Sequence, residues 1–128
     1  MDCPSLDLWM KEAKSDASSP LCGMYLVHNG VVRSTAKAEV RGGEKSAVVT
    51  GVRFAYDTDK VIRAENEAKS LPGIFYVRTW LNQGNLAVGD DLMLVLIGGD
   101  IRPHVVDALQ FLVERLKNEC VTETEIYE

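Results

Sequence analysis

Four cationic side chains stand at positions from which they could act on a negatively charged molecule. Arg33 follows two apolar residues of a predicted strand, so its side chain emerges where that strand ends. Arg102 stands at the start of a predicted helix, where the helix dipole disfavours a positive charge by about 0.3–1 kcal/mol. A phosphate or carboxylate bound there would offset that cost, because the N-terminal amides and the guanidinium would act on the same anion. Lys37 and Lys117 complete this set of candidates.

Each candidate also has an ordinary structural explanation. Arg102 could pair with Asp100 or extend into solvent, where the cost of its position is small. Lys117 lies near the end of the same predicted helix, where a positive charge is favoured by the dipole. Lys37 belongs to the basic segment 35–45, and such runs are typical of solvated loops. The local sequence leaves both kinds of explanation open.

The helix itself separates Arg102 from Lys117. A helical rise of about 1.5 Å per residue places the two residues about 22 Å apart. One small anion therefore cannot easily contact both residues of the same chain. A site that uses both is expected to combine two subunits.

The composition predicts one folded domain with a hydrophobic core. The chain has 128 residues, of which 46% are hydrophobic, and this fraction argues against a disordered chain. The formal net charge is −5. This charge disfavours non-specific binding to nucleic acids, although it leaves room for a locally basic pocket.

The cysteines and histidines do not form a metal-binding pattern. Cys3, Cys22 and Cys120 are an odd number without paired spacing, and His28 lies far from His104. We therefore expect free thiols in a reducing compartment, and neither a metal nor a cofactor. His28 is expected to be partly buried and hydrogen-bonded, and His104 to be an exposed residue of the first helical turn.

No segment has the pattern of a targeting or membrane-spanning sequence. The chain begins Met1-Asp2 and lacks a basic stretch followed by an apolar run. The longest apolar run, Leu92 to Ile97, is far too short to cross a bilayer. We expect a cytoplasmic protein that does not bind membranes.

Hydrophobic periodicity predicts three helices, each with apolar residues on one face. They are a first helix capped by Ser5, residues 57–71, and residues 101–119. The residues expected on their inner faces are Leu6, Trp9, Met10 and Ala13; Val61, Ala64, Ala68 and Leu71; and Val105, Val106, Leu109, Leu112, Val113, Leu116 and Cys120.

Four strands are predicted between these helices. They lie in residues 21–34, with a bulge or bend at Gly30; in 46–57; in a stretch that begins at Gly73 and turns around Gln83-Gly84-Asn85; and in 92–99. Residues 92–99 are apolar on both faces, which predicts a central strand. Alternation in 46–57 places five residues on one face, namely Val48, Thr50, Val52, Phe54 and Tyr56.

This order of elements predicts an α+β domain with a mixed or antiparallel sheet and flanking helices. We divide the chain into an N-terminal helix and loop (1–20), a main domain (21–119) and an acidic tail (120–128). The tail either adds a short edge strand or stays loose.

Two stretches of the main domain resemble the large, catalytic subunit of molybdopterin synthase. "GMYLVHNGVVRSTA" (23–36) is similar to that family's early strand, which ends in a Gly-x-Val-Arg-like motif before a loop. "NLAVGDDLMLVLIGGDIRPHVVDALQFLVERLK" (85–117) resembles its later turn, apolar strand, His-Arg junction and helix ending in Leu-Lys. The similarity covers most of residues 22–117 in the same order.

The resemblance implies an α/β hammerhead fold and a dimer of large subunits. It also implies a ubiquitin-like small subunit whose Gly-Gly C-terminus carries a thiocarboxylate. Sulfur passes from that thiocarboxylate to cyclic pyranopterin monophosphate during molybdenum cofactor biosynthesis. Lys117 matches the catalytic lysine, and Arg33 and Arg102 match anion-binding arginines, with Lys37 as a further anion-binding candidate.

The sequence departs from the family pattern at three places. Ile101 replaces the histidine before the arginine, "LNQGN" replaces an early His-Arg, and Thr124 stands near the place of a second lysine. These losses should weaken anion binding and transition-state stabilisation. Three functions follow: a divergent sulfur-transferring enzyme, a non-catalytic relative that binds a ubiquitin-like tail or pterin phosphate, and a stand-alone homodimer with other duties.

Overall fold

The computed structural model describes residues 2–35 and 48–128, so Lys37 lies outside the described residues. A short 3₁₀ turn follows the first helix, and a π-helical turn follows the last one. The elements are, in chain order, α1 (Leu6–Ser15), the 3₁₀ turn (Ser19–Leu21), β1 (Met24–Val31), β2 (Val49–Tyr56), α3 (Thr58–Lys69), β3 (Ile74–Leu81), β4 (Gly84–Ala87), β5 (Asp91–Gly99), α4 (Arg102–Arg115), the π-helical turn (Leu116–Cys120) and β6 (Val121–Tyr127).

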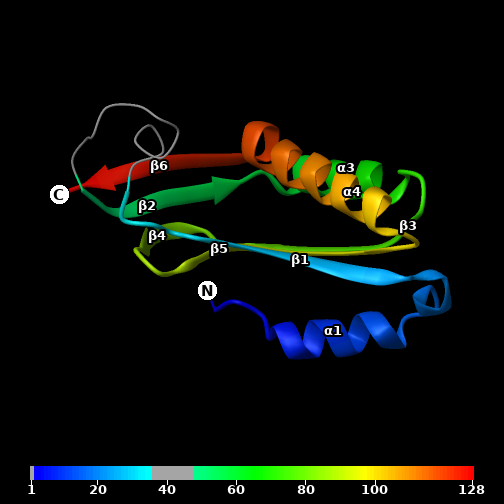
Figure 1. Cartoon of the computed structure of the whole chain (residues 1–128). Helices are drawn as coiled ribbons and strands as arrows, with labels where there is room; N and C mark the ends of the chain where they lie inside the picture. The colour runs from blue at the N-terminus through cyan, green and yellow to red at the C-terminus, as the bar shows by residue number, and fades with distance from the viewer. Residues whose placement is uncertain (1, 36–47) are drawn as a thin grey trace.

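Two antiparallel sheets of three strands organise the described part of the chain. The first has the strand order β1-β5-β3, and the second has the order β4-β2-β6. Helices α3 and α4 lie on one side of the first sheet, and α1 covers its opposite side (Figure 1). The predicted α+β fold class, with antiparallel sheets and flanking helices, is confirmed.

Strand β5 is the central strand that its apolar sequence predicted. Val95 and Ile97 face the main core, which includes residues of α3, α4 and β2. Leu94 and Leu96 face the other way, toward α1. Hydrogen bonds to β1 and β3 pair the backbone of β5 while both of its faces are buried.

The three predicted helices form close to their expected bounds. The Ser5 hydroxyl caps α1 by accepting a hydrogen bond from the Leu8 amide, and the Asp57 carboxylate caps α3 in the same way. The inner face of α4 carries the buried residues Val105, Ala108 and Leu112 at helical spacing. Within residues 2–35 and 48–128, no helix has both the length and the apolar character needed to cross a membrane.

The predicted inner face of β2 is partly wrong. Val52 and Phe54 are buried as expected, but Val48 is 54% exposed and Thr50 is also exposed. The pairing of β2 with β6 shifts register between Val49 and Gly51, and such a bulge reverses which side chains face inward. Val49, rather than its neighbours, therefore enters the core.

The chain crosses from one sheet to the other at the turn predicted around Gln83-Gly84-Asn85. Strand β3 pairs with β5, whereas β4 begins at Gly84 and pairs with β2. Gly84 has a φ of +98°, which favours glycine at this change of direction. The side chain of the buried Asn82 fixes the crossing, since its Nδ2 donates to the Asp91 carbonyl and its Oδ1 accepts from the Gln83 amide.

The acidic tail forms the edge strand β6, which is one of the two alternatives left open by its sequence. It pairs antiparallel with β2 from Val121 to Tyr127. The chain reaches β6 directly from the π-helical turn, in which Leu116 and Cys120 are buried. The carboxyl end of the last helix and the tail thus share one corner of the fold.

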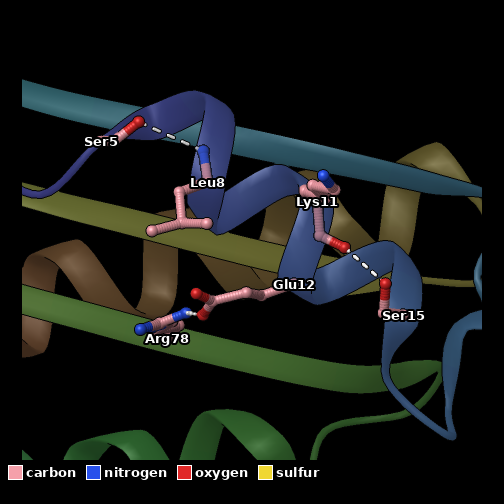
Figure 2. A network of polar contacts seen from close by, with 6 residues as sticks. All are labelled: Ser5, Leu8, Lys11, Glu12, Ser15 and Arg78. Atoms are coloured by element: carbon pink, nitrogen blue, oxygen red, sulfur yellow. Dashed lines mark hydrogen bonds and ion pairs between the residues drawn. The ribbon is translucent and has the colours of Figure 1, made fainter.

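Helix α1 is held on the outer face of the first sheet by apolar and ionic contacts. Trp9 and Ala13 are buried against Leu94 and Leu96 of β5. The Arg78 guanidinium of β3 lies over the Trp9 ring, with its carbon 4.6 Å from the ring centroid. The same guanidinium pairs with Glu12, and the Ser15 hydroxyl donates to the Lys11 carbonyl (Figure 2).

We predict that Trp9→Ala lowers the free energy of unfolding by about 3–5 kcal/mol, because it removes a large buried ring and leaves a cavity against β5. Trp9 is 4% exposed, whereas Leu8 on the same helix is 52% exposed. Leu8→Ala is therefore the matched control and should cost under about 1 kcal/mol. Denaturant unfolding of both variants is the measurement. Equal losses would show that α1 is not anchored through Trp9.

Candidate functional site

Arg33 and Lys117 line the same cavity, although they are far apart in the sequence. The cavity has a volume of about 540 Å³ and lies between the end of β1 and the end of α4. Its wall also includes His28 of β1 and the apolar side chains of Leu109 and Val113 of α4. The structure therefore brings together two of the predicted cationic residues within one chain.

The backbone on both sides of Arg33 is anchored. Val32 is buried; its amide donates to the Asp90 carbonyl at 3.0 Å, and its carbonyl accepts from the Gly89 amide at 2.9 Å. The Ser34 carbonyl accepts from the Val49 amide at 3.0 Å. Arg33 itself is exposed, so an exposed cation is carried on a fixed stretch of chain.

Lys117 lies in the π-helical turn that ends the last helix. Leu116 and Cys120 of this turn point into the core, and Lys117 between them is exposed. A π-helical turn of this kind is frequent at functional sites, because it shifts the following side chains around the helix axis. The turn thus holds the exposed Lys117 on the wall of the cavity.

A second cavity, of about 200 Å³, adjoins the first and adds acidic groups. It shares His28, Arg33 and Lys117 with the larger cavity and is also lined by Glu123 and Glu125 of β6. Lys117, Glu123 and Glu125 each take part in further polar or electrostatic interactions. The two cations therefore face carboxylates as well as open space, and these carboxylates oppose the binding of an anion.

Thr124 lies on the opposite face of β6 from these two acids. It is exposed, and alternation along the strand turns Glu123 and Glu125 toward the cavity instead. The place near which the family resemblance sets a second lysine is therefore occupied by acidic side chains.

His28 was not among the predicted site residues, but it lines both cavities. It is partly buried as expected. The predicted hydrogen bond is wrong for Nε2, which is withdrawn from solvent and has no hydrogen-bond partner among the described residues. Burial lowers the pKa of His28, and the positive charge of Lys117 lowers it further. The period-two spacing of His28 and Gly30 just before Arg33 was the signal that could have found this residue.

Arg102 lies at the other end of α4 and does not line the cavities that hold Lys117. Its side chain is exposed. Among the described contacts, the Asp100 carboxylate bonds to His104 Nδ1 at 2.7 Å and to the Ile101 amide at 2.6 Å, and not to Arg102. Within one chain, Arg102 is therefore exposed and is not paired with Asp100.

His104 lies in the first turn of α4 as predicted, but it is half-buried and bonded to Asp100 rather than fully exposed. The hydrogen bond from His104 is the largest cause that lowers the pKa of Asp100. Gly73, with a φ of +76°, makes room for the pair, because a Cβ there would lie 2.2 Å from Asp100 Oδ1. Within the part of the chain that the structure describes, no group of His, Cys, Asp and Glu side chains could hold a metal ion.

We predict that His28 titrates below its ordinary pKa of about 6.5. The unfolded chain then binds more protons than the folded chain between the lowered pKa and 6.5, so stability should rise with pH through this window. Below the lowered pKa, both states are protonated and the dependence ends. Histidine NMR of the folded chain gives the midpoint, and His28→Phe should flatten the stability profile in that window. A midpoint at or above 6.5 would contradict the prediction.

Three solved structures share this fold at low sequence identity. Molybdopterin synthase from Staphylococcus aureus is 18% identical; the match covers 100% of this chain and 89% of that chain, with a TM-score of 0.75. The molybdopterin biosynthesis MoaE protein from Burkholderia ambifaria is 17% identical, with 100% and 83% covered and a TM-score of 0.73. A protein–protein complex of subunits 1 and 2 of molybdopterin-converting factor from Helicobacter pylori contains a chain that is 14% identical, with 100% and 82% covered and a TM-score of 0.68.

The family model described as MoaE protein matches residues 5–119, a range that begins at the cap of α1 and ends in the π-helical turn. It includes Arg33, Arg102 and Lys117. No curated protein sequence matches the chain. The match spans most of the sequence, and it agrees with the resemblance carried by residues 23–36 and 85–117. The chain belongs to the MoaE family.

Proposed function

We propose that this chain is a divergent large subunit of molybdopterin synthase, which transfers sulfur from a small-subunit thiocarboxylate to cyclic pyranopterin monophosphate. Membership of the MoaE family supports a role in molybdenum cofactor biosynthesis. The observation that carries the finer proposal is the meeting of Arg33 and Lys117 in one cavity of about 540 Å³. A cation pair beside an apolar wall suits a ligand with an anionic group and a flat ring.

The proposed partner is a ubiquitin-like small subunit that inserts its Gly-Gly C-terminus. The Helicobacter pylori structure is a complex of two subunits of molybdopterin-converting factor, which supports a partner of this kind for the present chain. The C-terminal thiocarboxylate is an anion, as is the phosphate of the pterin. Two anions that meet at one site require several positive charges to offset their repulsion.

Each cationic residue has a proposed role. Lys117 is the catalytic residue, placed to stabilise the negative charge that develops as sulfur is transferred. Arg33 binds the substrate anion, and Lys37 assists it. Arg102 completes the site from the second subunit of a homodimer, because within one chain it lies at the opposite end of α4 from Lys117.

A second function is favoured by the acids of β6. Glu123 and Glu125 line the cavity where the family resemblance suggests a lysine, and Ile101 stands in place of a histidine. A relative with this balance of charge could bind the small-subunit tail or a pterin phosphate without transferring sulfur. Product formation separates this non-catalytic relative from the enzyme.

We predict that the purified chain, incubated with a thiocarboxylated small subunit and cyclic pyranopterin monophosphate, forms molybdopterin. Lys117→Ala should reduce the rate by about 100-fold or more, which is the usual effect of removing a group that stabilises transition-state charge. Lys11→Ala, on the exposed face of α1, is the matched control and should leave the rate unchanged. Complex formation without product would favour the non-catalytic relative, and absence of both would reject the two functions.

We predict that Lys117→Ala and Arg102→Ala complement each other. The two variants are mixed and their subunits are allowed to exchange at random. If each site combines Lys117 of one subunit with Arg102 of the other, a dimer with one subunit of each variant has one intact site and one site that lacks both residues. Activity should then recover to roughly one quarter of that of the unmodified protein, since half of the dimers are mixed. Sedimentation of the unmodified chain gives the oligomeric state. A dimer that shows no recovery would place Arg102 outside the site.

A further inference from the structure

The unpaired nitrogen of His28 is the feature of the cavity that the proposed function leaves unexplained. Nε2 is withdrawn from solvent and has no hydrogen-bond partner among the described residues. A buried polar group without a partner destabilises the folded chain, and in a native protein it is explained by strain, by a bound water or ion, or by a role in binding or catalysis. The imidazole lines both cavities, beside Arg33 and Lys117.

The local sequence of β1 places no side chain at position 30 beside Nε2. Gly30 lies two residues after His28 on the same face of the strand, and a Cβ at Gly30 would lie 3.6 Å from Nε2 and 3.1 Å from Met93 Cγ. A larger residue at Gly30 would therefore close the space over the imidazole edge. The smaller cavity is lined by His28, Gly30, Arg33 and Lys117 at this point.

The charge state of His28 differs from that of its cationic neighbours. Burial and the positive charge of Lys117 both lower its pKa, so the imidazole is neutral near pH 7. A neutral imidazole offers one ring nitrogen as a donor and the other as an acceptor, and it adds no charge. The cavity thus presents a cationic part, formed by Arg33 and Lys117, the acidic side chains of Glu123 and Glu125, and an uncharged hydrogen-bonding part at His28.

We propose that His28 determines the specificity of this cavity: Nε2 hydrogen-bonds an uncharged polar group of a ligand whose anionic group is held by Arg33 and Lys117. The ligand class is a compact molecule in which a phosphate or carboxylate is joined to a ring that carries N–H, carbonyl or hydroxyl groups. Because Nε2 is withdrawn from solvent, the ligand reaches it when a side chain on the cavity wall moves aside. The inference rests on the proposed function, because it assigns a part of the pterin substrate to His28.

Binding of two probes to the full-length chain tests this assignment. Cyclic pyranopterin monophosphate carries both kinds of group, whereas inorganic phosphate carries only the anion. His28→Phe keeps a planar ring but removes the ring nitrogens, and it should weaken pterin binding about threefold to tenfold, the usual range for one hydrogen bond. Phosphate binding should stay unchanged. His28→Gln retains a hydrogen-bonding group and should recover part of the loss.

Arg33→Ala separates a failure of this inference from a failure of the proposed function. It should weaken the binding of both probes, because it removes a positive charge. If Arg33→Ala weakens pterin binding while His28→Phe leaves it unchanged, the role of His28 is rejected and the proposed function stands. If Arg33→Ala and Lys117→Ala both bind the pterin as tightly as the unmodified chain, the proposed function fails and the role of His28 fails with it.

A spectroscopic readout tests the hydrogen bond without a substitution. The ¹⁵N chemical shift of His28 Nε2 in the labelled full-length chain should move toward a hydrogen-bonded value when the pterin is added, and should stay unchanged with phosphate alone. An unchanged shift at saturating pterin would overturn the proposal.

Discussion

Burial of β5 on both faces is the constraint on which the rest of the structure depends. Leu94 and Leu96 require a cover on one side, and Trp9 and Ala13 of α1 supply it. Val95 and Ile97 require a cover on the other side, where the main core includes residues of α3, α4 and β2. A central strand without this double cover would expose apolar surface worth about 25 cal/mol per Å². The layered arrangement in Figure 1 follows from this one requirement.

The same arrangement produces the candidate site, because it brings the end of strand β1 and the end of helix α4 to one corner of the fold. The end of β1 carries Arg33, and the π-helical turn after α4 carries Lys117. Neither residue is needed for the core, since both are exposed. Their positions are nevertheless fixed, because Val32 and Leu116 beside them are buried. Exposed cations on anchored backbone can meet a ligand without a large loss of backbone entropy.

The balance of charge in the cavity differs from the cationic pattern that the family resemblance implies. Two cations, Arg33 and Lys117, share the space with Glu123 and Glu125, and His28 contributes a hydrogen-bonding group without charge. Such a site attracts anions less strongly than one lined by cations alone. Selectivity among ligands then depends more on hydrogen bonds to uncharged groups. These bonds contribute less free energy than charge pairs do, but they depend more strongly on the direction of approach.

The sequence by itself determined the fold class, most of the elements and the family. Periodicity located the three helices and the double-sided strand β5, since those signals are local and do not depend on distant residues. The tertiary structure alone decided the inner face of β2, where the bulge between Val49 and Gly51 reverses the alternation, and the assignment of β3 and β4 to different sheets. It also decided that Arg33 and Lys117 line one cavity while Arg102 lies at the far end of α4. These outcomes depend on contacts between residues distant in the sequence, or on backbone geometry at one residue, and neither leaves a periodic signal in the chain.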